Sequence, residues 1–410
     1  MLAGPSSSTT ADVIILGGGV AALEATMGLR ELAGDRVRIS LVAASEDFVE
    51  RPMSVAEPFG LGTVRRYPLR EIAADFGAQF VHAAAIGVDA REPRLVFADG
   101  ATLPGSTLIL APGARTLAPF PQAITFGMGD AGEAVRELVG DLERGAIRRV
   151  AFVAPSLAGW TLPLYELALL TARAVADAGI EDASLHLITP EAQPVAVFGA
   201  EPSAIVAELL AGAGIEFHGA TYVDVHDGAV VLRRGAYSLS VDRIVALPLV
   251  RGPQLEGVPR TPPYDFIPVD QHGVVRGRTG VYAAGDATDF PVKQGGIAAQ
   301  QAEAVAQHVA ARCGAPIEPA PFAPVLRGML LTGAAPHFVR SRAAAGDDAV
   351  LASWEPLWWP PTKIAGRHLA PYLFARDAGP PTRPDVGAVD VDVALDAVRR
   401  PTPSAEQPIL

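Results

Sequence analysis

Residues 12–25 constrain the fold of this chain more than any other stretch. An apolar run ending at Leu16 leads into three glycines and then into a helix-forming segment. Gly17, Gly19 and Ala22 form a Gly-x-Gly-x-x-Ala pattern, which predicts a strand, a tight turn and a helix that together hold a dinucleotide. Gly17 lets the chain leave the strand, Gly19 admits a phosphate, and Ala22 lets the helix pack closely. The phosphate then faces free N–H groups at the start of the helix.

Length and charge narrow the class of protein. A chain of 410 residues, 50% of them hydrophobic, predicts two or three domains with large cores. No run of about 18 apolar residues lacks charge or proline, so we expect no transmembrane helix. Residues 1–11 are small and polar and predict a disordered tail rather than a signal peptide. The net charge of −12 argues against a nucleic-acid surface. We expect a cytoplasmic protein, at most peripherally associated with a membrane.

The first nucleotide-binding unit continues with a second strand over residues 36–43. An acid usually ends this strand and binds a ribose hydroxyl. Here the position holds alanine, and Glu46 and Asp47 follow slightly later as candidate substitutes. The next loop contains Arg51-Pro52, which either borders a phosphate or forms a surface turn.

Further strands are predicted at residues 79–88, 94–97 and 108–111, the last ending in Pro112-Gly113. The fully apolar composition of this last strand is typical of a parallel sheet covered on both faces.

A second strand–turn–helix unit begins at residue 149. Its turn, residues 155–160, lacks the Gly-x-Gly-x-x-Gly pattern, and its helix is predicted over 164–175. Its second strand is predicted over residues 185–191 and ends in the acid Glu191. This unit is either a nicotinamide-nucleotide site with a degenerate fingerprint or a duplicated domain kept as scaffold.

A second informative stretch covers residues 279–286, where an apolar strand runs into Gly285-Asp286. Glycine permits a close backbone approach, and Asp286 can accept a hydrogen bond from a sugar-alcohol hydroxyl. The loop at 293–296 precedes a helix predicted over 297–312, whose free N–H groups could face an anionic ring edge. Lys293 adds a charge there or is a solvated loop residue. It and Lys363 are the two lysines of an otherwise Arg-rich chain.

Cysteine and tryptophan usage add two constraints. Cys313 is the single cysteine, so an internal disulfide, a Cys-x-x-Cys pair and a thiolate zinc site are excluded. Trp354, Trp358 and Trp359 fall within six residues. Such aromatics suit a buried lid, a quinone slot or a contact with a membrane interface.

The paired stretches 17–22 and 279–286 resemble the FAD motifs of two-dinucleotide-binding-domain flavoproteins, the pyridine nucleotide-disulfide oxidoreductase-like group. Residues 110–113 resemble that group's Ala-Thr-Gly turn, with Pro112 in place of threonine. Within the group, the chain looks most like sulfide:quinone oxidoreductases, flavocytochrome c sulfide dehydrogenases and type II NADH dehydrogenases. The resemblance implies an α/β fold of two Rossmann-like domains, the second inserted in the first, with a smaller C-terminal region.

The implied domains are an FAD-binding domain at 12–120 and 265–320, an NAD(P)-binding-like domain at 121–264, an aromatic-rich region at 321–380 and a tail at 381–410. FAD is the implied cofactor, and NAD(P)H is kept as a second one. The cofactor-binding residues implied by the resemblance are Gly17, Gly19, Val20, Ala21, Ala22, Arg51, Pro52, Ala83, Ala111, Pro112, Gly113, Gly285, Asp286, Lys293, Gln294 and Gly295.

The chain also departs from these relatives. Sulfide:quinone oxidoreductases carry redox cysteines beside the flavin, but here Trp160 lies near the equivalent place. The type II NADH dehydrogenases have a Gly-rich second fingerprint, which is absent here. We therefore expect an FAD-dependent oxidoreductase that passes electrons from a small-molecule donor to a quinone or similar acceptor without a redox disulfide. The alternative is an FAD-binding scaffold with little or no turnover. Lys293, Glu166 and His337 are the catalytic candidates, and a homodimer is kept open.

Overall fold

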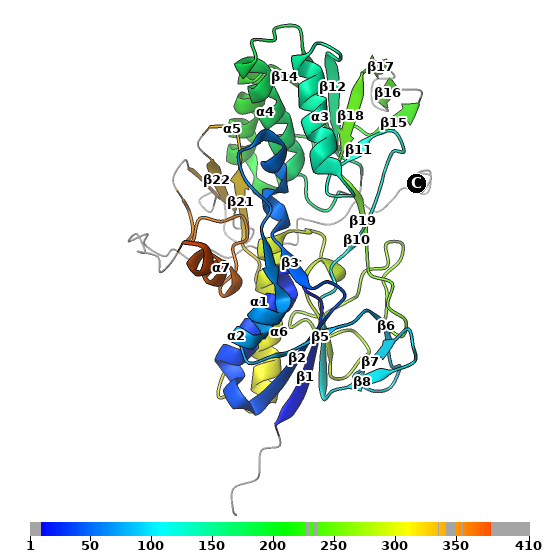
Figure 1. Ribbon diagram of the computed structural model, residues 1–410, viewed down its shortest axis with the longest axis vertical. Coiled ribbons are helices and arrows are strands. Elements are labelled where there is room, and N and C mark those ends of the chain that lie inside the picture. The colour runs from blue at the N-terminus through cyan, green and yellow to red at the C-terminus, as the bar shows by residue number, and fades with distance from the viewer. Residues whose placement is uncertain are drawn as a thin grey trace, which may run out of the picture.

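The computed structural model describes residues 10–156, 158–226, 229–232, 237–334, 336–341, 350–353 and 356–378. They form two α/β domains arranged along the longest axis of the molecule (Figure 1). The predicted N-terminal tail, apart from its last two residues, and the predicted tail at 381–410 lie outside these residues, as does Trp354. The strand at residue 281 returns to the sheet that begins at residue 11, after the chain has built the second sheet. The predicted fold class is therefore confirmed.

The first domain is built on a parallel five-stranded sheet of order β20-β9-β1-β2-β5. The strands are β1 (Ala11–Leu16), β2 (Val37–Ala43), β5 (Gln79–His82), β9 (Thr107–Leu110) and β20 (Val281–Ala283). Val13 and Ile15 of β1 pack with the core beneath helices α1 (Val20–Ala33) and α6 (Gly295–Arg312). Ile14 and Leu16 pack on the other face. That face is covered by β6 (Ala85–Val88), β7 (Arg94–Phe97) and β8 (Thr102–Pro104). The apolar strand is thus buried on both sides.

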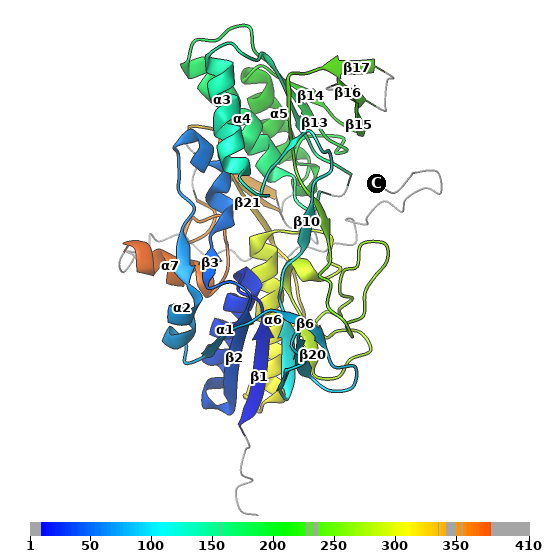
Figure 2. The same ribbon diagram turned by 45° about the vertical axis from the view of Figure 1, so that its right-hand side comes forward.

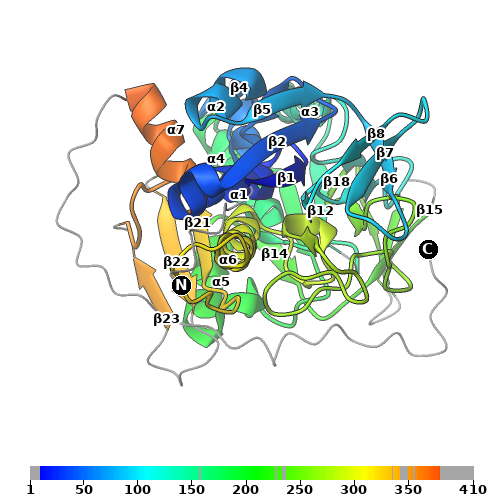
Figure 3. The same ribbon diagram turned by 90° about the horizontal axis from the view of Figure 1, so that it is seen from below.

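Helices α1 and α6 lie side by side against this sheet, as the view from below shows (Figure 3). The core that the two helices share contains many alanines, among them the fully buried Ala22, Ala302 and Ala306, and a Cβ on Gly28 of α1 would lie 3.2 Å from the Ala306 Cβ of α6. Small side chains let the two backbones approach closely, which brings the start of α6 beside the start of α1.

The second domain repeats the plan with a parallel sheet of order β11-β18-β12-β13-β14. Its strands are β11 (Ile124–Thr125), β12 (Arg149–Val153), β13 (Ser184–Ile188), β14 (Ile215–His218) and β18 (Arg243–Ala246). Helices α3 (Ala131–Glu143), α4 (Leu162–Asp177) and α5 (Ala200–Gly212) cover one face. The antiparallel strands β15 (Val223–His226), β16 (Ala229–Leu232) and β17 (Tyr237–Ser240) cover the other (Figure 2).

Two crossing segments connect the domains, and in them β10 (Arg115–Leu117) pairs antiparallel with β19 (Leu249–Arg251). A hairpin of β3 (Asp47–Val49) and β4 (Arg66–Pro68) extends the first domain and leads into α2 (Leu69–Asp75). The C-terminal part forms β21 (Leu326–Leu330), β22 (His337–Ser341), β23 (Val350–Ser353) and α7 (Leu369–Ala378), which packs beside α1. Among the described residues, no helix combines the length and apolar character needed to cross a bilayer.

Several predicted element boundaries were wrong. The strand expected over 185–191 ends at Ile188 as β13, before the acid at Glu191. The strand expected over 79–88 breaks after His82, so that β5 joins the parallel sheet and β6 the flanking sheet. Helix α4 begins at Leu162 and includes Pro163 in its first turn, where the missing proline N–H costs no hydrogen bond. Helix α6 begins at Gly295, because the Gln294 side chain caps it by accepting the N–H of Ile297 at 2.9 Å.

A buried acid joins α1 to the C-terminal part. The Glu24 carboxyl is fully buried and accepts the N–H groups of His368 and Leu369 at 2.7 and 2.9 Å. Burial, helped by the neighbouring Glu303 carboxyl, raises the pKa of Glu24 to about 7 against the lowering effect of the two N–H groups. Glu24 therefore binds its proton more tightly in the folded state than in the unfolded chain.

This pKa predicts a pH dependence of stability. The unfolded chain loses the Glu24 proton near the ordinary value of 4.5, whereas the folded protein keeps it to about 7. The free energy of unfolding should therefore fall as pH rises between these values. We expect Glu24→Gln to flatten that decline, measured by urea unfolding across the window. Glu133→Gln, at an exposed acid in α3, is the control and should leave the wild-type slope intact. A Glu24→Gln slope equal to that of the wild type would contradict this assignment.

Candidate functional site

The turn after β1 has the backbone that its glycines require. Gly17 has φ of 137°, and a Cβ there would lie 2.1 Å from the carbonyl oxygen of Ala111. A Cβ at Gly19, by contrast, would meet nothing within 4 Å. Gly19 is the N-cap of α1 and provides no side chain to the first N–H groups of the helix. The space above this helix start therefore suits an anionic group of a ligand.

The turns after β9 and β20 lie at the same edge of the sheet. The Ala111 N–H donates to the carbonyl of Leu16 at 2.7 Å, and the Ala284 N–H donates to that of Leu110 at 3.1 Å. A Cβ at Gly285 would approach the Cβ of Ala21 to 2.9 Å. The two sequence stretches that suggested a cofactor thus meet in space, at the carboxyl ends of β1 and β20, which lie on either side of β9, at the edge where open parallel sheets bind ligands.

Asp286 and Lys293 continue this edge. Burial raises the pKa of Asp286, and the Lys293 ammonium opposes that rise. Lys293 is itself buried, and its Nζ donates to the carbonyl oxygen of Thr288 at 2.5 Å. The same Nζ lies 3.7 Å from the centre of the Phe266 ring, a cation–π contact. In this conformation the Lys293 amino group is held by its own domain, so its predicted role beside a flavin ring stays a prediction.

Glu191, the acidic residue of the second strand–turn–helix unit, accepts hydrogen bonds from side chains of its own domain. The Tyr165 hydroxyl donates to Glu191 at 2.8 Å, and that of Thr189 donates to the same oxygen at 3.3 Å. Burial raises the pKa of Glu191, while these hydroxyls lower it. This arrangement agrees with the lack of a Gly-rich fingerprint in the 155–160 turn. It leaves both readings of the second unit open.

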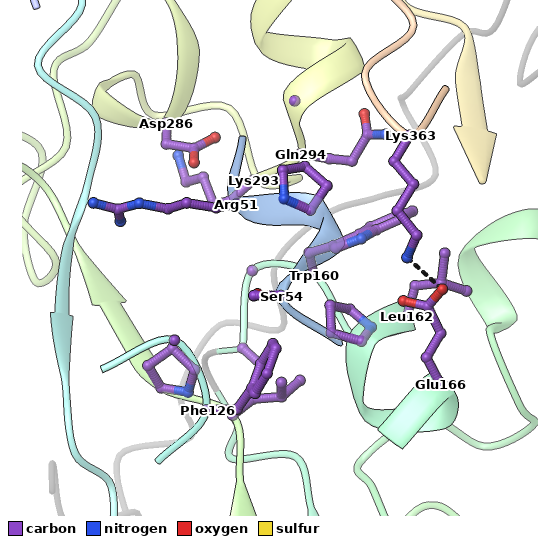
Figure 4. Close-up of a pocket in the computed structure, with 18 of the residues that line it drawn as sticks. Arg51, Ser54, Phe126, Trp160, Leu162, Glu166, Asp286, Lys293, Gln294 and Lys363 are labelled. Atoms are coloured by element: carbon purple, nitrogen blue, oxygen red, sulfur yellow. Dashed lines mark hydrogen bonds and ion pairs between the residues drawn. The ribbon is translucent and has the colours of Figure 1, made fainter. Parts of the chain in front are cut away.

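A cavity of about 280 Å³ opens between the two domains (Figure 4). Arg51, Pro52, Asp286, Lys293, Gln294 and Gly295 line it from the first domain. Apolar side chains come from elsewhere, namely Phe126, Trp160, Leu162, Leu247 and Met329. Sequence reasoning placed Trp160 near this site but missed the other four. The Arg51 side chain makes no hydrogen bond or ion pair with any other residue in the described part of the chain, so its guanidinium group remains available to an anion.

An ion pair closes one end of the cavity. Lys363 Nζ contacts Glu166 Oε1, and the two side chains are only 8% and 1% exposed. Glu166 Oε1 also accepts the N–H of Leu331 at 2.9 Å. Burial raises the pKa of Glu166, and the Lys363 ammonium lowers it. Figure 4 shows this pair across the Trp160 ring from Asp286 and Arg51. In the sequence, Lys363 stood out because it is one of only two lysines, but the sequence did not indicate that it pairs with Glu166.

The other candidates lie elsewhere. His337 is buried in β22 and does not line the cavity, and burial lowers its pKa. Ala83 follows β5, and its N–H donates to the carbonyl of Ala43 at 2.9 Å. The Glu46 carboxylate lies 3.4 Å from His82, at the carboxyl ends of β2 and β5 where an acid for a ribose was sought.

The two described tryptophans of the aromatic cluster border a different cavity. Trp358 stacks edge-on against Phe338, and Trp359 does so against Phe374. Both line a space of about 410 Å³ with the polar side chains of Gln300, Glu303, Gln307, Arg327 and Arg367. They contribute to neither the fingerprint turn nor the interdomain cavity.

These features define a protein of two Rossmann-like nucleotide-binding domains with an interdomain cavity at the fingerprint edge. The chain belongs to the pyridine nucleotide-disulphide oxidoreductase family, whose profile matches residues 11–308. No curated protein sequence matches it.

Several solved structures share the fold. The sulfide:quinone oxidoreductase of the hyperthermophilic bacterium Aquifex aeolicus superposes with a TM-score of 0.75 at 16% identity, covering 84% of this chain and 86% of that one. A ferredoxin reductase of Rhodopseudomonas palustris gives 0.60 at 20% identity, covering 81% and 83%. NDH2 from Plasmodium falciparum, solved with NADH, gives 0.55 at 15% identity, covering 68% and 65%. At these identities the likeness concerns the fold.

Proposed function

We propose that this member of an oxidoreductase family binds FAD and passes electrons from a reduced small-molecule donor to a quinone or similar acceptor, without a redox disulfide. The turn at residues 17–22 supports FAD binding. A Cβ at Gly17 would clash with the backbone, whereas the space beside Gly19 is open, and this is where the diphosphate of FAD would approach. Bound there, FAD would supply the redox chemistry. The residues proposed to hold it are Gly17, Gly19, Val20, Ala21, Ala22, Arg51, Pro52, Ala83, Ala111, Pro112, Gly113, Gly285, Asp286, Lys293, Gln294 and Gly295.

The interdomain cavity is the observation that carries the proposed acceptor. Its walls are aromatic and aliphatic around Trp160, which suits a flat apolar ring. The buried Glu166–Lys363 pair lies at the end of the cavity opposite Asp286. There a carboxyl and an ammonium group can hold a proton beside an acceptor oxygen. The single cysteine of the chain leaves no disulfide to carry electrons.

Anaerobic mixing of the purified protein with NADH, NADPH or sulfide tests the proposal through bleaching of the flavin absorbance. We expect one donor to bleach it and a soluble quinone analogue to restore the colour. Bound flavin that no donor reduces, with a redox behaviour that quinone analogues leave unchanged, would instead support the FAD-binding scaffold. Flotation with liposomes tests the proposed limit of peripheral membrane association, since tight flotation would contradict it.

Two tryptophans provide a matched pair of variants for the acceptor site. Trp160 lines the interdomain cavity and Trp358 lines the other, and each stacks edge-on against a phenylalanine. We expect Trp160→Ala to raise the KM for the quinone analogue about tenfold, the loss of about 1.4 kcal/mol of aromatic contact. Trp358→Ala should leave that KM within about twofold. Equal effects of the two variants would count against the cavity as the acceptor site.

A further inference from the structure

Three potential metal ligands meet in the second domain, away from the interdomain cavity. His186 lies in β13, and Glu216 and His218 lie in the adjacent strand β14. The parallel register pairs His186 with Glu216 and places His218 two residues further along the same face. Their neighbour on this face, Ile188, packs in the core shared with the β15–β17 layer rather than under the helices.

The distances between the donor atoms match a tetrahedral site. His186 Nδ1 lies 3.2 Å from His218 Nε2 and 3.3 Å from Glu216 Oε2, and His218 Nε2 lies 3.5 Å from Glu216 Oε1. Ligands at about 2.0–2.1 Å from a tetrahedral zinc ion stand about 3.3–3.4 Å from one another. Among the described residues, this is the group of three candidate ligands whose donor atoms all lie within 4.8 Å of one another.

A shared proton satisfies this cluster less completely than a cation does. His186 Nδ1, His218 Nε2 and the Glu216 carboxylate can each present a lone pair to the space between them. A single proton can bridge only two of these three groups. The second nitrogen of His186 is held by the Ser184 hydroxyl at 3.0 Å, an outer contact of the kind that orients metal-bound histidines.

The burial of the three side chains also fits a site with access from solvent. The imidazoles of His186 and His218 are 9% and 7% exposed, whereas the Glu216 side chain is 63% exposed. An ion can therefore enter beside the carboxylate and keep water in its fourth position. Two imidazoles and one carboxylate are borderline donors, which suit zinc among the common divalent ions.

We propose that His186, Glu216 and His218 bind one Zn²⁺ ion, which ties β13 to β14 on the face of the sheet opposite the helices. The site lies outside the fingerprint turn and the interdomain cavity, so the ion would have a structural role. The proposal does not depend on the proposed oxidoreductase function.

Calorimetric titration of the chelator-treated full-length protein with ZnCl₂ tests the site, together with metal analysis after gel filtration. We expect one Zn²⁺ per chain and a rise in the thermal unfolding midpoint, since an ion that binds only the folded state stabilises it. Glu216→Gln should weaken the affinity at least tenfold, and His218→Gln should do the same.

Glu216→Gln is the decisive variant, because the exposed side chain can be changed without disturbing the core. His308→Gln is the matched control, since His308 stacks on His272 at 5.0 Å in another histidine pair. It should bind Zn²⁺ as the wild type does. The proposal is overturned if the wild type binds no stoichiometric Zn²⁺, if Glu216→Gln binds it equally well, or if His308→Gln loses as much affinity.

Discussion

Replacing Gly19 by valine should abolish the proposed binding of FAD while leaving the chain folded. The backbone at Gly19 has φ of −96° and ψ of −169°, which any L-residue can adopt, and an added Cβ meets no protein atom within 4 Å. The new side chain instead occupies the space above α1 where a phosphate would lie. We expect FAD affinity to fall at least 100-fold, about 2.7 kcal/mol. The apoprotein should lose less than about 1 kcal/mol of stability, the range of N-cap changes.

Gly17→Ala is the matched contrast. Its Cβ would lie 2.1 Å from a backbone carbonyl oxygen at φ of 137°, so the turn itself must move. We expect this variant to lose more than about 2 kcal/mol of stability as apoprotein. Flavin absorbance per chain and urea unfolding of the apoproteins separate the two effects. A Gly19→Val protein with a full complement of flavin would refute the proposed phosphate position.

Lys363→Met is expected to give the largest loss of stability. It leaves the Glu166 carboxylate in a site that is 1% exposed, without its cation. Removing one partner of a buried ion pair costs about 3–5 kcal/mol. Glu166→Gln in the same chain should recover most of that loss, because the amide carries no charge and can still accept the Leu331 N–H. Urea unfolding of the single and double variants measures both quantities.

The loss in Lys363→Met should also depend on pH. Without the ammonium, the pKa of Glu166 in the folded state rises further above its ordinary value of 4.5, so the stability deficit should grow as the pH rises above that value. Arg173→Met is the control on the same helix, since its ion pair with Asp177 is more than half exposed. It should cost less than about 1 kcal/mol at either pH. If Lys363→Met loses no more stability than Arg173→Met, the Glu166–Lys363 pair does not contribute to the stability of the fold.

The sequence by itself determined the features that depend on neighbouring residues. The positive φ of Gly17 is a property of its own turn, so the local sequence is enough to favour glycine there, while the carbonyl oxygen of Ala111 adds a steric reason from a distant segment. The apolar residues of β1 must likewise be buried on both faces of the sheet, and the strand's own sequence is enough to show this. These constraints predicted the first strand–turn–helix unit, whereas the arrangement of two Rossmann-like domains was implied by the resemblance to two-dinucleotide-binding-domain flavoproteins, and the family match agrees with it.

Tertiary structure alone decided which distant side chains meet. Glu166 and Lys363 are 197 residues apart, and their contact depends on how α4 and the C-terminal part pack. The Lys293 amino group reaches the carbonyl oxygen of Thr288 and the face of the Phe266 ring instead of the open cavity, and no local pattern encodes that choice. The register that brings His186 beside Glu216 is likewise a property of two strands and not of either one. Local sequence limits the conformations of a turn, whereas long-range contacts depend on the packing of the whole chain.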